Sequence, residues 1–179
     1  MLSLVYLKTK DNKMYIQSPA PFPNNISTGV FIGGGISNCP RWQDEIADLL
    51  IPTNHTIFNP RRVGDLAKDG DEAAQQIEWE YKALDLSTIL LFWFPKESVC
   101  PITLFEYGKA LAWAERGFIR KLIVGRDPEY PRVFDLDTQT AVDSQHSRLW
   151  VASVTNPRAQ LFYTKSFDEF KDTIKTELL

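Results

Sequence analysis

The stretch Ile89-Leu-Leu-Phe-Trp-Phe94 is followed by Pro95 and then by a helical pattern from Ile102 to Arg116. An apolar run without polar alternation predicts a strand that is buried on both faces, as in a parallel sheet. Gly117 marks the end of the predicted helix. A buried strand followed by a helix of this length is the unit from which α/β folds are built.

The same alternation of strand and helix recurs on both sides of this unit, which implies right-handed crossovers between parallel strands. We therefore predict an α/β fold, a three-layer sandwich with a central, mainly parallel five-stranded sheet. Ser37 or Asn38 is expected to cap the first helix. The predicted strands are Gly29–Ile36, Thr56–Phe58, Ile89–Phe94, Leu122–Gly125 and Leu161–Tyr163, and the predicted helices cover Arg41–Leu50, Glu72–Leu86, Ile102–Arg116, residues 136–154 and the segment that the capping box Ser166–Glu169 opens.

Residues 1–28 do not follow the alternation of strand and helix that characterises the rest of the chain. Weak alternation from Leu4 to Ile16 suits a hairpin that turns at residues 11–13, and the Pro-rich stretch Ser18–Pro23 follows it. The sequence therefore predicts a short N-terminal β appendage over residues 1–28 and one domain over residues 29–179.

The length, the net charge and the cysteine content of the chain argue against several classes of function. A chain of 179 residues corresponds to about one domain, and 20 Lys and Arg against 23 Asp and Glu give a net charge of −3, which argues against a nucleic-acid polymer as partner. The longest apolar run is too short to cross a membrane and the N-terminus lacks a signal-peptide pattern, so we expect a cytoplasmic protein. Cys39 and Cys100 are interpreted as reduced thiols, with a disulfide as the alternative, and no metal-ligand spacing is present.

Ligands of open α/β sheets bind beyond the carboxyl ends of the strands, so the loops there are the candidate binding segments. Gly33-Gly34-Gly35 suits either an anion-binding nest or a plain tight turn, and neither common glycine-rich nucleotide motif is present. Asn59-Pro-Arg-Arg62 follows the second strand and is either a ligand-binding or a solvated basic turn.

Acidic residues on two predicted helices are candidate catalytic groups. Glu78 and Glu80 lie two apart and cannot share one helix face, so one of them at most faces the strand ends. Glu106 lies near the start of its helix, where the positive end of the helix dipole favours an ionised carboxylate. Ordinary exposed glutamates are the alternative for both Glu80 and Glu106.

Four stretches in order resemble the nucleoside 2-deoxyribosyltransferase-like family: Phe31–Gln43, Phe58–Arg62, Gln76–Glu80 and Phe92–Gly108. The resemblance covers roughly residues 29–126 and implies a flavodoxin-like fold. It also implies that Glu106, in the context Glu-Tyr-Gly, is a nucleophile that attacks the anomeric carbon of a 2-deoxyribosyl donor, as in retaining glycosidases. Glu80 stands where relatives carry an aspartate, and would orient the nucleophile or handle the proton of the leaving base.

The resemblance implies a small-molecule nucleoside or nucleotide and a free nucleobase as partners, no cofactor, and a homo-oligomer of two or more subunits. Cys100 stands near the place where some relatives carry a further acid, and Asp135 and Asp137 are expected either to reach the sugar or to cap a helix. Trp42, Trp79 and Trp93 would stack a base or lie in the core, the core being favoured for Trp93. Arg61 or Arg62 would meet a 5′-phosphate. The candidate substrate-binding residues are Gly33, Gly34, Gly35, Trp42, Asn59, Arg61, Arg62, Trp79, Pro101 and Gly108.

Three functions remain open on the sequence. The first is transfer of a 2-deoxyribosyl group between nucleobases through a covalent glutamyl intermediate. The second is hydrolysis of 2-deoxynucleoside 5′-monophosphates, in which water replaces the acceptor base. The third is a non-catalytic module that senses a nucleotide or an ADP-ribose-type ligand.

Overall fold

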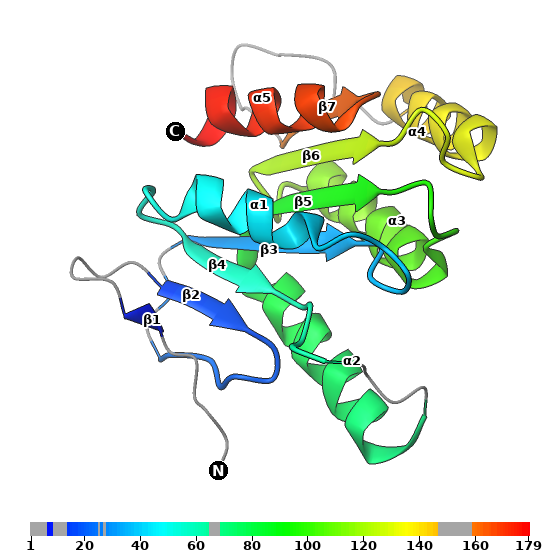
Figure 1. The fold of residues 1–179 in the computed structure, drawn as a ribbon. Helices are drawn as coiled ribbons and strands as arrows, with labels where there is room; N and C mark the ends of the chain where they lie inside the picture. The colour runs from blue at the N-terminus through cyan, green and yellow to red at the C-terminus, as the bar shows by residue number, and fades with distance from the viewer. Residues whose placement is uncertain (1–6, 9–13, 25, 27, 65–68, 147–158) are drawn as a thin grey trace.

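A computed structural model describes residues 7–8, 14–24, 26, 28–64, 69–146 and 159–179. Within these residues one sheet of seven strands has the order β1-β2-β4-β3-β5-β6-β7 (Figure 1). The strands are β1 (Leu7–Lys8), β2 (Met14–Gln17), β3 (Gly29–Gly34), β4 (Thr56–Asn59), β5 (Ser87–Phe94), β6 (Lys121–Arg126) and β7 (Gln160–Thr164). The helices are α1 (Trp42–Leu50), α2 (Gly70–Asp85), α3 (Pro101–Arg116), α4 (Val133–His146) and α5 (Phe167–Leu178).

The sheet has the strand order of a flavodoxin-like fold. Its neighbouring strands from β2 to β7 are parallel, and β1 alone among the described strands runs antiparallel to its neighbour β2. The five strands that the sequence predicts lie side by side as β4-β3-β5-β6-β7. Numbered along the chain, this is the order 2-1-3-4-5 that is typical of flavodoxin-like proteins. The predicted fold is therefore confirmed.

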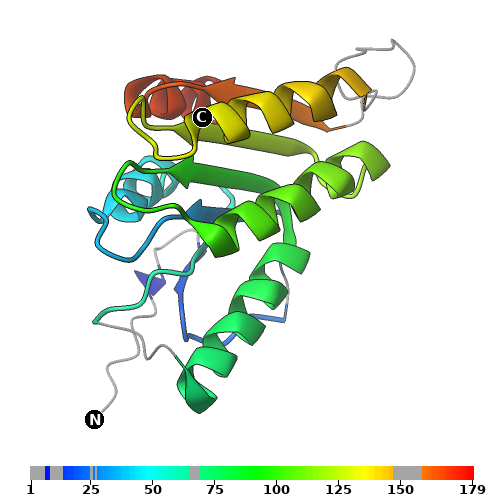
Figure 2. The same cartoon turned by 90° about the vertical axis from the view of Figure 1, so that its right-hand side faces the viewer.

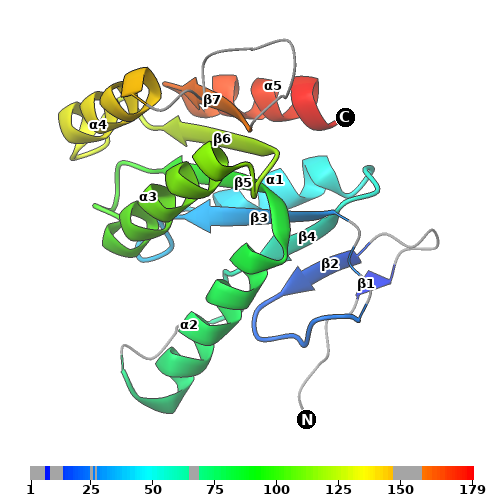
Figure 3. The same ribbon diagram turned by 180° about the vertical axis from the view of Figure 1, so that it is seen from behind.

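Helices cover both faces of the sheet, α1 and α5 on one side and α2, α3 and α4 on the other (Figures 2 and 3). Side chains of β5 alternate between the two cores because successive strand residues point to opposite faces. Phe92 and Phe94 pack with Tyr107 of α3, whereas Trp93 packs with Phe167 and Phe170 at the opposite face. This arrangement explains the unbroken apolar run of β5.

The N-terminal segment extends the sheet. Strand β2 pairs in parallel with β4, so the expected appendage adds strands to the sheet edge. The predicted turn at residues 11–13 lies outside the described residues. Beyond β2, the indole N–H of Trp79 on α2 donates to the Ala20 carbonyl at 2.8 Å, and the Phe22 and Trp79 rings lie 5.1 Å apart. The segment after β2 therefore packs against α2.

Two predicted helix caps are wrong. Helix α1 begins at Trp42 and is preceded by Arg41, whose side chain makes no cap hydrogen bond, so neither Ser37 nor Asn38 caps it. Helix α4 begins at Val133, which places Asp135 in its first turn and Asp137 after it. Cap residues precede the helix, so neither aspartate is a cap. Residues 147–154 of the predicted fourth helix lie outside the described residues.

Candidate active site

Strands β3, β4 and β5 end at the same edge of the sheet, and the segments that follow them bring polar side chains together. Arg62 comes from the loop after β4, Gln76 and Glu80 from α2, and Glu106 from α3. Arg62 and Gln76 act electrostatically on Glu80, and the charge of Glu80 acts on Glu106. Two carboxyls that are 26 positions apart in the chain therefore belong to one cluster, which we call the carboxylate cluster (Arg62, Gln76, Glu80 and Glu106).

Glu106 is a protonatable carboxyl with an unusual pKa. Desolvation by burial and then the nearby charge of Glu80 raise its pKa to about 8, against a smaller opposing effect of Lys109. The expectation that the helix dipole favours an ionised Glu106 is therefore wrong. Glu106 is the sixth residue of α3 and is half-buried. The dipole effect fades beyond the first turn, so desolvation outweighs it.

Glu80 is the second carboxyl of the cluster. Burial raises its pKa, while the hydrogen bond from Gln76 and the charge of Arg62 lower it in part. Gln76 Nε2 donates to Glu80 Oε1 at 2.8 Å. Glu78 is exposed, as expected for a residue two positions away on the helix. Because the charge of Glu80 raises the pKa of Glu106, the ionisation of one carboxyl is linked to that of the other.

Arg62 places a guanidinium near Glu80, where its charge lowers the Glu80 pKa. Its Nε donates to Gln76 Oε1 at 2.5 Å, and its Nη1 lies 3.2 Å from Glu72 Oε1. Its Nη2 is buried and has no hydrogen-bond partner among the described residues. Guanidinium N–H groups are strong donors to phosphate and carboxylate oxygens, so the Nη2 of Arg62 is available to an acceptor that the described residues do not supply.

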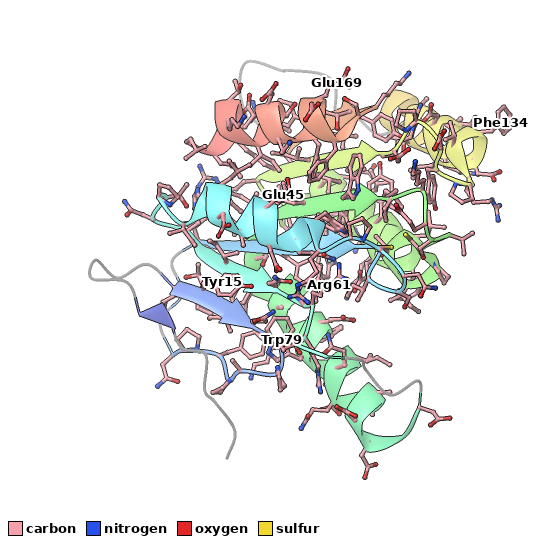
Figure 4. The ribbon with its side chains drawn as sticks, viewed as in Figure 1. Tyr15, Glu45, Arg61, Trp79, Phe134 and Glu169 are labelled. Atoms are coloured by element: carbon pink, nitrogen blue, oxygen red, sulfur yellow. The ribbon has the colours of Figure 1, made fainter. Side chains whose placement is uncertain are left out.

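Arg61 does not share this role, although it is adjacent in sequence. Its guanidinium donates to the carbonyls of Pro40 and Cys39 and to Gln43 Oε1, and so fastens the loop after β3 (Figure 4). Asn59 is fully buried, donates to the Tyr15 hydroxyl at 2.8 Å and accepts from the Arg61 backbone N–H at 2.9 Å. Both side chains are occupied by the fold, which leaves Arg62 as the donor of this turn.

The three glycines at the end of β3, of which Gly33 and Gly34 are its last two residues and Gly35 follows it, are needed for close packing. A Cβ at Gly33 would lie 2.6 Å from the Phe92 ring, and one at Gly34, whose φ is +153°, would lie 2.3 Å from the Trp93 carbonyl oxygen. A Cβ at Gly35 would lie 2.5 Å from Pro95 and 2.9 Å from the sulfur of Cys100. The protein's own atoms thus fill the space beside each Cα, which favours the tight-turn interpretation over an anion-binding nest.

The tryptophans named as base-stacking candidates lie in the core. Trp42 is 3% exposed, and its indole N–H donates to the Gly35 carbonyl at 2.9 Å. Trp79 is 6% exposed and packs against Phe22 and Phe58. Because their rings and N–H groups are already in contact with the protein, the structure does not bring either tryptophan to the carboxylate cluster as a stacking surface.

The remaining candidates on α3 lie apart from the cluster. Pro101 is the exposed first residue of the helix, and Gly108 is exposed with open space around its Cα. Gly108 lies two residues after Glu106 and hence on another helix face. Cys100 is buried, and burial raises the pKa of its thiol, so it is a neutral packing group where an acid was considered.

Asp137 also has a structural partner. It forms an ion pair with Arg126, whose Nη2 lies 2.8 Å from Asp137 Oδ2, and accepts from the Tyr163 hydroxyl at 2.6 Å. Asp135 pairs with the exposed Arg132. These contacts hold α4 to the ends of β6 and β7, and nothing brings the two aspartates to the carboxylate cluster.

Sequence reasoning did not select Gln76 as a site residue. The sequence feature that could have identified Gln76 is the spacing Gln76-x-x-x-Glu80, which places both side chains on one face of a helix. Glutamine is common on exposed helix faces, however, and only the structure shows that this one is 3% exposed.

Comparison with known proteins agrees with the four motifs. A family model described as "Nucleoside 2-deoxyribosyltransferase like" matches residues 27–119, and no curated protein matches the chain. Among the described residues no group of three or more His, Cys, Asp or Glu is arranged to hold a metal ion. In the same part of the chain, no helix is both long and apolar enough to span a bilayer.

Proposed function

The chain belongs to the nucleoside 2-deoxyribosyltransferase-like family, and from this premise we propose that it transfers a 2-deoxyribosyl group between nucleobases. The family implies a nucleoside or a nucleobase as substrate. The observation that carries the proposal is that two carboxyls on different helices lie near enough for the charge of Glu80 to raise the pKa of Glu106. Retaining transfer at an anomeric carbon needs one carboxylate as nucleophile and a second group that moves a proton.

In the first step, an ionised Glu106 oxygen attacks C1′ of the donor. The bond between C1′ and the base nitrogen breaks, its electron pair stays on that base, and the base takes a proton from Glu80. A glutamyl-deoxyribosyl ester forms. Glu106 makes no hydrogen bond to another described side chain, so its oxygens are free for this attack.

In the second step, a nitrogen of the acceptor base attacks C1′ from the face that the first base left. The ester bond breaks, Glu106 leaves as a carboxylate, and Glu80 takes the proton from the acceptor nitrogen. Two inversions give net retention, and the pair returns to its starting state with one proton.

Base exchange with purified protein tests the proposal. We expect a deoxynucleoside incubated with a second free base to give the new deoxynucleoside and the original base in equal amounts, as measured by chromatography. Each deoxynucleoside and each 5′-monophosphate is assayed with and without acceptor. Absence of exchange across this panel would contradict transfer, and binding of a nucleotide without turnover would instead support the sensing module.

One observation favours hydrolysis of 2-deoxynucleoside 5′-monophosphates as a second candidate. The buried Nη2 of Arg62 has no partner in the described part of the chain, and an unmet buried donor costs about 1–3 kcal/mol. A phosphate oxygen of a bound monophosphate would satisfy it. In this reaction water attacks C1′ of the ester in place of the acceptor base.

Arg62→Lys separates the two substrates. Lysine keeps the positive charge beside Glu80 but lacks the planar fork that binds phosphate, so we expect kcat/KM for the 5′-monophosphate to fall about tenfold or more relative to the nucleoside. The measurement is base release from both substrates by wild type and variant. An equal loss for both substrates would show that Arg62 serves the carboxylate pair and not a phosphate.

A further inference from the structure

Gln76 is a buried amide whose polar atoms are all engaged. Its Oε1 accepts from the Ser18 hydroxyl at 2.6 Å and from Arg62 Nε at 2.5 Å. Its Nε2 donates to the Pro60 carbonyl and to Glu80 Oε1, both at 2.8 Å. This is the full capacity of a primary amide, two bonds accepted and two donated.

The chemistry of the partners fixes which way the amide points. Arg62 has only donors, so the atom that faces it is the Gln76 oxygen, and the Pro60 carbonyl has only an acceptor, so the atom that faces it is the Gln76 nitrogen. The group that faces Glu80 is therefore an N–H. A flipped amide would set donor against donor at Arg62 and acceptor against acceptor at Pro60.

We propose that Gln76 is the positioning residue of the site: it holds Glu80 by one carboxylate oxygen and leaves the other oxygen to exchange a proton with the substrate. This inference rests on the proposed function and adds to it the residue that orients the acid. Within the described residues Glu80 Oε2 has no hydrogen bond, whereas Oε1 is held by Gln76. Glu80 therefore presents one defined oxygen to the reacting base.

The same amide connects Glu80 to the N-terminal segment. Ser18, which follows β2, is 3% exposed and donates its hydroxyl hydrogen to Gln76 across 58 positions of the chain. The Gln76 amide is thereby held from three sides, by Ser18, by the turn after β4 and by its own helix. A side chain with few accessible rotamers positions its partner with little further loss of entropy.

Gln76→Glu tests the donated bond. A carboxylate at position 76 still accepts from Ser18 and Arg62 but no longer donates to Glu80 or to the Pro60 carbonyl. We expect kcat to fall by about 10²-fold with KM nearly unchanged, because a misplaced acid affects the transition state more than binding. The charged groups around the new carboxylate are Arg62 with its partner Glu72, then Glu80, and through Glu80 also Glu106 and Lys109. An added negative charge makes both carboxyls of the site harder to ionise, so both limbs of the pH profile of kcat/KM should move to higher pH.

Two control variants separate positioning from folding. Gln75→Glu makes the same change at the neighbouring exposed position of α2, and we expect kcat and the pH profile to stay at wild-type values. Ser18→Ala removes one bond to Gln76 Oε1 and leaves the donation to Glu80, and we expect less than about threefold loss of kcat. Thermal unfolding of each variant shows whether it is folded.

A titration without substrate keeps this inference separate from the proposed function. In protein labelled with ¹³C-carboxyl glutamate, NMR follows Glu80 directly, and Glu80→Gln assigns its signal. We expect Gln76→Glu to raise the Glu80 pKa, because a stabilising hydrogen bond is lost and a negative charge is gained. An unchanged Glu80 titration, or equal effects of Gln75→Glu and Gln76→Glu, would overturn the inference. If Gln76→Glu raises the Glu80 pKa as expected but the wild-type protein exchanges no bases, only the proposed function would be overturned.

Discussion

Replacing Glu106 by glutamine is expected to lower base exchange by on the order of 10⁴-fold or more. The glutamine amide has nearly the same shape but is not a nucleophile, so no ester with C1′ forms. The measurement is the initial rate of exchange under conditions that reveal the wild-type activity. Glu78→Gln is the matched control, because Glu78 is exposed on α2, and it should retain wild-type activity.

The pH dependence of the wild-type protein follows from the same pair. The active form is the one-proton state of the pair in which the proton has moved to Glu80 and Glu106 is ionised; without substrate, the charge of Glu80 favours this proton on Glu106. Burial and the charge of Glu80 raise the pKa of Glu106 to about 8, so the last proton leaves the pair near that pH and kcat/KM should fall as the pH rises through about 8. The acidic limb should lie above the ordinary glutamate range, because burial also raises the Glu80 pKa.

Two results would contradict this assignment. Activity that persists in Glu106→Gln would exclude the ester and point to direct displacement or to another nucleophile. Activity that keeps rising above pH 8 would mean that the fully ionised pair is the active form, and Glu80 would then orient the nucleophile without moving a proton. In the second case Glu106 keeps its role and only that of Glu80 changes.

Replacing Asp137 by alanine is expected to lower the free energy of unfolding by about 3 kcal/mol. The variant leaves the Arg126 guanidinium, whose side chain is 9% exposed, without its carboxylate, and the Tyr163 hydroxyl loses its acceptor. For a chain of this size such a loss corresponds to a melting temperature roughly 6–12 °C lower. Thermal unfolding measures it directly and needs no substrate.

The pH dependence of this effect has a defined sign. The hydrogen bond from Arg126 holds the pKa of Asp137 below its ordinary value. The ion pair therefore stabilises the fold above that ordinary value, and its contribution is lost as the pH falls through the lowered pKa. The stabilities of wild type and variant should converge in acid.

Asp135→Ala is the matched control for this prediction. Asp135, in the first turn of α4, pairs with Arg132 just before the helix, but the two side chains are 53% and 56% exposed. Exposed ion pairs contribute about 0–1 kcal/mol, so this variant should unfold within about 1 kcal/mol of wild type. Similar losses in the two variants would show that α4 depends on acidic side chains in general and not on the Arg126 pair.

The sequence contained enough to predict the sheet. The apolar run of β5 and the repeated alternation with helices indicated parallel strands, and β5 is parallel to both of its neighbours, β3 and β6. Helix starts were less predictable, because Ser37 and Asn38 have the side chains of good caps and yet the loop after β3 continues to Arg41. Arg61 accounts for this loop, since its guanidinium binds the carbonyls of Cys39 and Pro40.

For the candidate site, the sequence by itself determined which acids to consider. Glu80 and Glu106 stand on two helices that flank the most buried strand, and the family motifs contain both. Local periodicity indicated that Glu78 and Glu80 lie on different helix faces, and the family motif selected Glu80; the structure shows that Glu78 is exposed.

Only the tertiary structure decided what the neighbouring groups do. Arg61 and Arg62 are adjacent in sequence, but one fastens a loop and the other faces the carboxyl pair. In the sequence Gln76 is an ordinary polar residue. Only the fold brings Arg62 and Ser18, which is 58 positions away, to its side-chain oxygen. Burial and nearby charges set the pKa of a carboxyl, and hydrogen-bond acceptors occupy the donors of a guanidinium. The groups responsible come from segments that are distant in the chain, so the sequence alone does not show them.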